Sequence, residues 1–342
     1  MMFNHASNAV STKARTMYGK RLSEKDFRYL CGCKNVTEIA LYLKSNTHYG
    51  KYMPSFHSGE IHRGALEAHL HQAYYEKCSS LCRYEVTVGD FFYRYIINTA
   101  EIDIMMRFLT LLSAGKTNEY MYIMPVYMDK HSNVDIRALA SVKTFDQLLK
   151  VTEGTPYHPI FLSHKPENGI YDFAGIECDL NNDLYKHTFA MIDKHTHKKE
   201  KKQLENIFKM MLSAKNIDII IRLKKYYKMS PDEMEKLLYN FGVFNNKQLD
   251  KLLKSDENNI KKILSESSKG RKIVKFISDD STTDSRLLSR ISKKNIRSSP
   301  YPSVVLLSYL FLSEIEMVNL FNIIEGVRYQ ASPDMINNML IY

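Results

Sequence analysis

Cysteines are the first residues of this 342-residue chain whose spacing could support metal chemistry. One residue separates Cys31 from Cys33 and three separate Cys78 from Cys82, so four thiolates are available for a tetrahedral zinc site. The first spacing is shorter than that of the usual zinc knuckle, and the second pair falls on one face of a predicted helix. Five cysteines in a chain of this length therefore indicate free, buried thiols in a reducing compartment.

Histidine and acidic pairs give no stronger evidence for a reactive site. Two histidine pairs, at 69–71 and 195–197, lie on predicted helices, where side chains two residues apart point in different directions. Glu314 and Glu316 have the same spacing and are poorly placed to act together as a catalytic acid and base. No motif combines a nucleophile, a base and oxyanion donors, so we predict a non-catalytic protein without a cofactor or a metal.

The composition favours helices over strands. The chain contains only 13 glycines and 9 prolines, whereas an all-β chain of this size would need many more turn residues. Apolar residues recur at helical spacing along most of the sequence, and strict alternation is rare. We therefore predict an all-α fold. The clearest helices are expected at 37–44, 63–82, 90–114, 202–227, 232–239 and 304–325.

Serine residues mark three of the expected helix starts. Ser23 opens the sequence SEKD, and Ser-Pro-Asp occurs at 230–232 and again at 332–334. Serine is a preferred N-cap and proline fits the first helical position. No apolar run approaches the roughly 18 residues of a membrane span, and the longest, 304–312, is interrupted by Ser308. The N-terminus does not resemble a signal peptide, so a cytoplasmic location is predicted.

The net charge of +10 is compatible with nucleic acid, an acidic protein or an anionic membrane surface as a partner. The densest basic cluster, at 197–202, begins a polar helix, and such a run is usually a solvated helix face. The sequence contains no zinc-finger spacing, aromatic RNA-binding signature or glycine-rich phosphate loop. Direct binding of nucleic acid is therefore the weaker alternative.

Internal repeats carry more information than the charge. Residues 36–49 and 144–157 both form an amphipathic segment that ends in Thr-x-Tyr, through Thr47 and Tyr49 in the first copy and Thr155 and Tyr157 in the second. A weaker third copy without the tyrosine spans 259–271. Threonine at a helix end can bond to free carbonyl groups and tyrosine can pack its ring, so the motif is interpreted as a helix stop.

A second motif also occurs three times, as EIDI at 101–104, NIDI at 216–219 and EIEM at 314–317. In the first two copies an arginine follows the acidic residue by four positions, which places both side chains on one helix face. These pairs are Asp103 with Arg107 and Asp218 with Arg222. The third copy lacks the pair, because Leu320 follows Glu316.

The repeat spacing exceeds that of solenoid proteins and predicts three related helical units instead. Unit boundaries are expected at 1–100, 101–215 and 216–313, with 314–342 completing the first unit. Because the same surfaces recur on each unit, the units should pack around a pseudo-threefold axis. The C-terminal segment would then return to the N-terminal unit and close the ring.

Three stretches carry a resemblance to a known family. They are RTMYGKRLSEKDFRYLCGCKNVTEIALYLKSNTHYG up to Gly50, FDQLLKVTEGTPYHPIF at 145–161, and YLFLSEIEMVNLFNIIEG at 309–326 with Tyr309, Glu314, Glu316, Asn319 and Leu320. In their order and spacing these stretches resemble the C subunits of the V/A-type ATPases, whose eukaryotic relative is the d subunit. The resemblance covers essentially the whole chain.

The resemblance implies a funnel of three similar helical units with no active site. Such a protein is a socket in the central stalk. It receives the D and F shaft subunits and rests on the cytoplasmic face of the membrane ring of c-type (K) subunits. The protein would thus be a monomer in a multisubunit complex, peripheral to the membrane. It would transmit torque between ATP hydrolysis or synthesis and proton or sodium transport, without a small-molecule substrate or nucleic acid.

Two alternatives remain open from the residues alone. A helical scaffold of the same shape could act outside any ATPase, and co-purification with rotor subunits would distinguish the two. A basic nucleic-acid-binding helical protein would show steeply salt-dependent binding to oligonucleotides.

Overall fold

A computed structural model describes residues 2–53, 61–129, 131–278 and 282–342. The described residues form helices joined by short turns and contain no β-strand, only an isolated bridge between Glu167 and Ile170. The prediction of an all-α fold is therefore confirmed. The chain divides into two compact units, one formed by residues up to Tyr93 together with Leu288–Tyr342, the other by Arg94–Leu287. We call them unit 1 and unit 2; the predicted division into three repeats stays a prediction.

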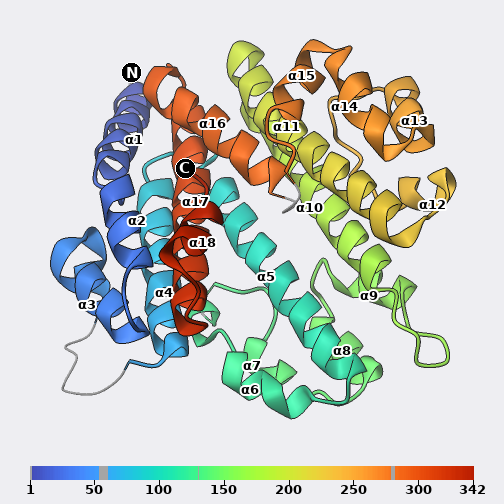
Figure 1. The fold of residues 1–342 in the computed structure, drawn as a ribbon, viewed down its shortest axis with the longest axis horizontal. Coiled ribbons are helices and arrows are strands. Elements are labelled where there is room, and N and C mark those ends of the chain that lie inside the picture. Colours follow the sequence, from blue (N-terminus) through green and yellow to red (C-terminus); the bar gives the residue numbers. More distant parts are fainter. Residues whose placement is uncertain (1, 54–60, 130, 279–281) are drawn as a thin grey trace. The chain divides into compact units, whose positions relative to one another are not determined.

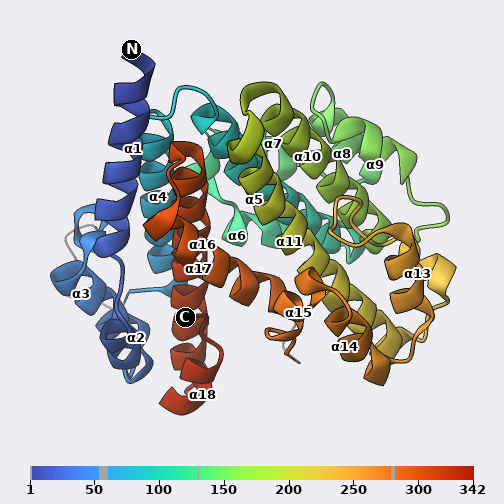
Figure 2. The same cartoon turned by 90° about the horizontal axis from the view of Figure 1, so that it is seen from above.

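Unit 1 combines the two ends of the chain (Figure 1). Its helices are α1 (Met2–Gly19), α2 (Glu24–Cys31), α3 (Val36–Asn46), the short 3₁₀ helix η1 (His48–Tyr52), α4 (Arg63–Cys82), most of α16 (Thr283–Ser298), α17 (Pro302–Arg328) and α18 (Pro333–Asn338). The C-terminal helix α17 packs against α1 and α4, as Figures 1 and 2 both show. Segments from opposite ends of the sequence therefore share one core.

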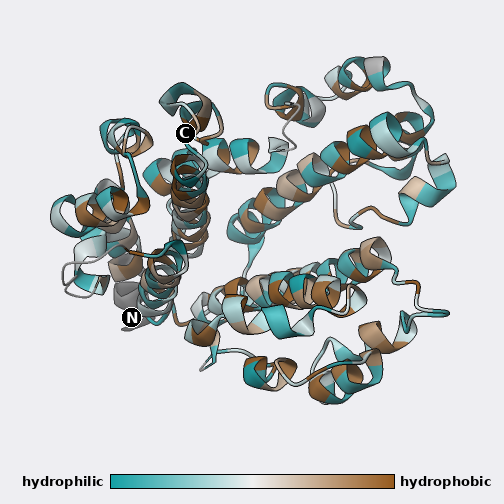
Figure 3. Cartoon of the chain, turned by 60° about the horizontal axis from the view of Figure 1, so that its bottom comes forward, coloured by the Kyte–Doolittle hydropathy of each residue, from teal (hydrophilic) through white to brown (hydrophobic). Residues whose placement is uncertain are grey.

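Unit 2 is built from more and shorter helices. They are α5 (Gly89–Ser113, from Arg94 on), η2 (Thr117–Glu119), α6 (Tyr120–Ile123), η3 (Val126–Met128), α7 (Ile136–Leu139), α8 (Phe145–Thr152), α9 (His158–Ser163), α10 (Phe173–His195), α11 (Lys198–Arg222), the π-helical turn η4 (Leu223–Tyr227), α12 (Pro231–Glu235), α13 (Asn246–Lys254), α14 (Glu257–Ser265) and α15 (Ser268–Val274). The long helices α10 and α11 form a hairpin, and each carries both hydrophobic and hydrophilic residues along its length (Figure 3).

The serine caps form as predicted. Ser23 and Ser230 each accept a hydrogen bond from a backbone N–H three residues on, and each completes a capping box with the acidic residue at that position. Ser332 caps α18 in the same way, although no capping box forms there. Local hydrogen-bonding groups therefore determine where these helices begin, since an unpaired N–H at a helix start is unfavourable.

Some helix bounds differ from the predicted ones. The expected helix at 63–82 coincides with α4, whereas the one expected at 202–227 begins earlier, at Lys198, and its last turn is the π-helical η4. The helix expected at 232–239 ends already at Glu235. Apolar periodicity continues past these ends because the following turns also contribute buried side chains, such as Leu238.

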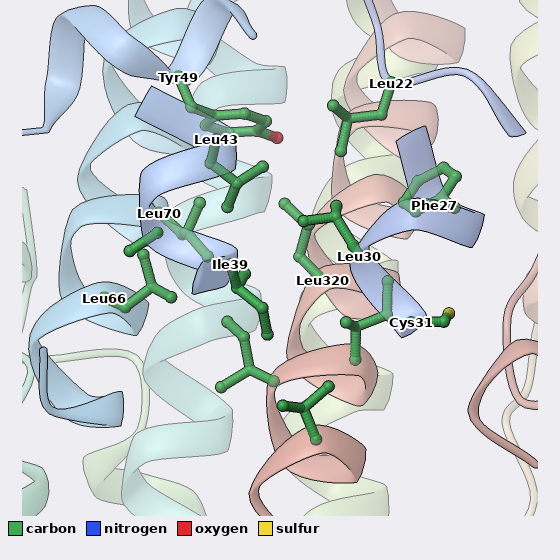
Figure 4. Close-up of a cluster of buried hydrophobic side chains, with 14 of the residues drawn as sticks. Leu22, Phe27, Leu30, Cys31, Ile39, Leu43, Tyr49, Leu66, Leu70 and Leu320 are labelled. Atoms are coloured by element: carbon green, nitrogen blue, oxygen red, sulfur yellow. The ribbon is translucent and has the colours of Figure 1, made fainter. Parts of the chain in front are cut away.

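The core of unit 1 is a cluster of buried, mostly aliphatic side chains, chiefly from α2, α3, α4 and α17 (Figure 4). Leu30, Ile39, Leu43, Leu66 and Leu320 have no exposed surface, so the centre of the cluster is closed to solvent. Burying each such side chain contributes roughly 1.5–3 kcal/mol. The cluster therefore joins the C-terminal helix α17 firmly to the N-terminal helices.

Helix α17 is the one described helix that is long and apolar enough to cross a membrane. Its most apolar 18-residue window is 83% buried inside the structure, which is the environment of a core helix. Ser308, which interrupts the run, is itself buried and donates to the carbonyl of Val304. Buried on nearly every side, α17 needs apolar residues all around its circumference.

Candidate functional site

The carboxylate of Glu316 is the centre of a buried polar contact in unit 1. Its Oε2 accepts a hydrogen bond from the backbone N–H of Leu22 at 2.9 Å, and its Oε1 accepts one from the hydroxyl of Tyr49 at 2.8 Å. Leu22 directly precedes the cap of α2, and Tyr49 lies in η1. The carboxylate on α17 therefore holds two N-terminal segments that are 294 and 267 residues away in sequence.

Thr47 places Tyr49 for this contact. Its hydroxyl donates to the carbonyl of Leu43 at 2.5 Å, which ends α3, and accepts from the N–H of Tyr49 at 3.2 Å. Burial, together with the neighbouring Glu316 carboxylate, raises the pKa of Tyr49 well above its usual value. The tyrosine hydroxyl thus keeps its proton and acts as a permanent hydrogen-bond donor.

The same arrangement occurs in unit 2, around Glu101 on α5. Its carboxylate accepts hydrogen bonds from the hydroxyls of Tyr157 and Ser132 and from the backbone N–H of Asn133. Thr155 repeats the role of Thr47, because its hydroxyl donates to a carbonyl of the preceding helix and accepts from the N–H of Tyr157. Both Thr-x-Tyr motifs therefore present a tyrosine to a buried glutamate.

A simpler third version of this arrangement has serines in the positions of the glutamate and the threonine. Ser213 on α11 accepts the N–H of Val243 at 2.7 Å, two residues before the cap of α13, so it takes the position of the glutamate. Ser267 takes the position of the threonine and accepts from the N–H of Gly270 at 2.9 Å. A Cβ atom on Gly50 or Gly270 would clash with the carbonyl oxygen six residues upstream. This shared close approach supports the same local fold at 259–271 as at 36–50.

Asparagines on two of the long helices form a further repeated contact. Asn319 donates to the carbonyl of Ile341 and accepts from its N–H, at 2.8 and 2.9 Å. Asn216 makes the same pair of bonds to Tyr239, with the same distances. Each bonded residue follows a Ser-Pro-Asp start by the same interval, which equates α12 with α18. The segment from Asn216 to its Ser-Pro-Asp start is one residue longer than the corresponding segment from Asn319. The π-helical turn η4 accommodates the extra residue.

The remaining residues of the predicted acidic motif lie outside these contacts. Asp103, Arg107 and Arg222 are exposed, and Glu314 is half-buried. Asp218 is buried and accepts from both the N–H and the hydroxyl of Thr283. The hydrogen bonds therefore show that Glu101, Ser213 and Glu316 are the equivalent residues of the three repeats. The sequence motif instead aligned Asp103, Asp218 and Glu316.

Sequence reasoning did not identify Glu101, Asn133, Ser213 and Asn216 as contact residues. Glu101 and Asn216 each begin a copy of the acidic motif, but the shared pattern drew attention to the third position. A signal for the backbone partners of Glu101, Ser213 and Glu316 is their position just before a helix cap. Leu22, Asn133 and Val243 each precede a capping residue by one or two positions.

His48 lies beside the Glu316 contact. Its Nδ1 is 3.1 Å from the carbonyl oxygen of Lys20, to which it donates, and its Nε2 accepts from Nζ of Lys77 at 2.8 Å. The carboxylate of Glu316 lies 3.8 Å from Nε2. Burial and the positive charges of Lys77 and Lys51 lower the pKa of His48 to about 4. The imidazole is therefore neutral in the folded protein at neutral pH.

His48 should make the protein less stable in mild acid. Since its pKa is lowered from 6.5 to about 4, the unfolded chain binds more protons in that pH range, and stability falls as the pH decreases through it. The loss at the acidic end should reach about 3 kcal/mol. Urea unfolding of His48→Gln across this range should show a weaker pH dependence than wild type. His62→Gln, at an exposed histidine, is the control, and equal slopes for wild type and His48→Gln would contradict the assignment.

The five cysteines are all free thiols, and four of them are buried. Burial raises the pKa of Cys82 to about 12 and that of Cys33 and Cys178 to about 11, so these thiols are poor nucleophiles. Within the described residues, no three His, Cys, Asp or Glu side chains converge on a position for a metal ion. The contacts described above are those of a structural protein.

Large apolar side chains are exposed where each long repeat helix leads into the next short helix. After α5 they are Met121, Tyr122, Ile123 and Val126; after α11, Tyr226 and Tyr227; after α17, Tyr329, Met335 and Met339. Tyr122 is 90% exposed and the others are 40–68% exposed. Exposed apolar side chains grouped along the chain in this way are suited to protein association. We call these residues the helix-end apolar groups.

Comparison with known proteins gives a consistent result. The family model for the ATP synthase (C/AC39) subunit matches residues 10–339. A protein named as the C subunit of an A-type ATP synthase, from Methanosarcina mazei, is 22% identical over 343 residues, covering 96% of this chain and 91% of the relative. A protein with the same name from Thermococcus onnurineus is 24% identical over 348 residues, covering 96% of this chain and 88% of the relative.

Proposed function

Because the chain belongs to the family of ATP synthase C/AC39 subunits, we propose that it is the socket of the central stalk in a V/A-type rotary ATPase. The C subunit of the A-type ATP synthase is a structural subunit, not a catalytic one. In the proposed role the chain receives the D and F shaft subunits and contacts the membrane ring of c-type (K) subunits from the cytoplasmic side. It then transmits torque between ATP hydrolysis or synthesis and proton or sodium transport.

The observation that carries the proposal is the family match across nearly the whole chain. A torque-transmitting part also needs stiffness, and the repeated carboxylate contacts support this requirement. Glu101 and Glu316 each join a long helix to two separate segments through hydrogen bonds that are buried or partly buried. Satisfied buried polar contacts favour a single rigid arrangement of helices.

The helix-end apolar groups support a partner-binding role. They follow α5, α11 and α17 along the chain, so three related units around a pseudo-threefold axis would each present an apolar surface to one partner. We propose that these surfaces contact the shaft. A basic surface, consistent with the net charge of +10, would face acidic partner surfaces or anionic lipid headgroups.

Co-expression with the shaft and ring subunits of the same organism tests the proposal. Wild-type chain should co-purify with D and F, and with the ring from detergent-solubilised membranes. The triple variant Tyr122→Ser, Tyr226→Ser and Tyr329→Ser should reduce capture of D and F at least tenfold, because buried aromatic side chains dominate interface energies. Ile170→Ser is the matched control, since Ile170 is 76% exposed outside these groups.

Two results would contradict the proposal in different ways. A chain that co-purifies with neither shaft nor ring would indicate a free-standing scaffold. Normal capture of D and F by the triple variant would leave the socket role intact and remove the helix-end apolar groups from the shaft interface.

A further inference from the structure

A cavity of about 540 Å³ lies within unit 1, between α1, η1, α4 and α17. Its volume is in the range of small-molecule sites, which is roughly 300–1,000 Å³. The socket role proposed above does not use it.

Positive side chains dominate the cavity wall. Five cationic side chains line it, namely Lys13, Lys20, Arg21, Lys51 and Lys77, and Glu316 is the one carboxylate among the lining residues. The wall thus has a formal excess of four positive charges. None of the five cations forms an ion pair with a carboxylate in the described parts of the chain. Clustered cations that outnumber the nearby carboxylates are characteristic of sites that bind anions.

The carboxylate of Glu316 offsets one of the five positive charges, and an excess of four remains. Each of its two oxygens already accepts a hydrogen bond, from Tyr49 and Leu22, and its side chain is only 10% exposed. The neighbouring His48 is neutral and accepts a hydrogen bond from Lys77. The other cations make contacts with neutral groups, such as Lys51 with the ring of Tyr52 and Arg21 with the ring of Tyr18.

Lys77 and Tyr18 give the cavity the character of a built site. Lys77 is 7% exposed, and its ammonium group lies over the ring of Tyr49 and against His48. Burial lowers the pKa of Lys77 and the Glu316 carboxylate raises it, so a further anion in the cavity would stabilise the buried ammonium group. Tyr18 is 8% exposed, and its buried hydroxyl has no hydrogen-bond partner among the described groups. Both side chains therefore offer a donor hydrogen to an occupant of the cavity.

The rest of the wall is apolar or aromatic. Met17, Tyr52, Tyr309 and Leu312 supply this surface. A bare phosphate ion would occupy only part of the volume, so the wall fits an occupant with both a multiply charged head and an organic body. Aromatic side chains are suited to pack against a base or another flat ring.

We propose that this cavity binds an organic oligophosphate, with the phosphate groups held by Lys77, Lys20, Lys51 and the hydroxyl of Tyr18. The same chemistry is found in a free nucleotide and in a phosphoinositide headgroup. The site is distinct from the helix-end apolar groups, and the proposal does not depend on the rotor assignment.

Isothermal titration of the full chain with inorganic tripolyphosphate and with ATP tests the proposal. Both should bind, ATP more tightly because its body contacts the apolar wall. The double variant Lys20→Gln and Lys51→Gln should weaken both at least tenfold, and these exposed lysines are not required for folding. Lys77→Met should abolish binding, while Lys247→Gln with Lys262→Gln removes the same charge elsewhere and should bind as wild type.

Sedimentation with vesicles identifies the source of the anion. Capture by phosphatidylcholine vesicles containing a phosphoinositide, lost in the Lys20 and Lys51 double variant, would assign the site to a lipid headgroup; binding of ATP without capture would assign it to a free nucleotide. Either result supports the proposal. Absence of binding to every probe would overturn it, as would equal weakening in the control variant. A third outcome would identify an acidic protein segment as the occupant and overturn the proposal. In that case the wild-type chain binds no phosphate compound, and the double variant no longer captures a rotor protein.

Discussion

Replacing Glu316 with alanine should lower the free energy of unfolding of unit 1 by about 3 kcal/mol. The substitution leaves the hydroxyl of Tyr49 and the N–H of Leu22 buried without an acceptor, and each unsatisfied group costs roughly 1–3 kcal/mol. Glu316→Gln should lower the free energy of unfolding less than Glu316→Ala does, because the amide keeps one acceptor oxygen. Some loss remains, because the amide turns its NH₂ donor toward the other partner. Chemical denaturation combined with hydrogen exchange of α2 and η1 measures the effect within unit 1.

Two controls separate this contact from general sensitivity to substitution. Glu76→Ala removes an exposed glutamate from α4 and should change stability by no more than about 0.5 kcal/mol. In a double-mutant cycle, Tyr49→Phe should offset part of the cost of Glu316→Ala, because the orphaned hydroxyl is then gone. Strictly additive effects of the two substitutions would show that the hydrogen bond contributes nothing.

Asn319→Ala should release the C-terminal residues from α17. The side chain of Asn319 is 1% exposed and satisfies both backbone groups of Ile341, so its removal leaves two buried polar groups unpaired. The expected loss is about 2–3 kcal/mol. Amide hydrogen exchange over α18 and the following residues should accelerate at least tenfold, while exchange in α10 and α11 stays unchanged.

The same helix provides the matched control. Asn322→Ala lies one turn further along α17 on a half-buried side chain and should leave exchange in α18 unchanged. Asn216→Ala should reproduce the effect in unit 2 by freeing the segment around Tyr239. If Asn319→Ala and Asn322→Ala behave alike, the paired bonds to Ile341 do not hold α18 in place.

Local chemistry explains why much of the fold could be read from the sequence. Ser23, Ser230 and Ser332 begin helices as predicted, because an N-cap needs only a hydroxyl and an N–H three residues on. Helix α4 has the predicted bounds. The family resemblance, drawn from the order of motifs along the chain, is confirmed by the match across residues 10–339.

The sequence did not reveal which acidic residue of each motif is buried. In EIDI the buried contact residue is Glu101, whereas in EIEM it is Glu316, the second of the two acidic residues. Side chains at i and i+2 point to different sides of a helix, but α5 and α17 carry apolar residues around most of their circumference. Such a helix has no clear polar face, so the spacing of its apolar residues cannot indicate which acidic side chain is buried.

Sequence alone determined that this chain is a helical structural protein, where several helices begin, and that its motifs recur. Those features depend on neighbouring residues and on their order. Only the tertiary structure decided which carboxylates and amides hold the helices together, since Glu316 meets Leu22 and Tyr49 across nearly the whole chain. The positive cavity in unit 1 likewise exists only after folding. Its cations come from α1 and the turn after it, from η1 and from α4, and no short motif brings them together.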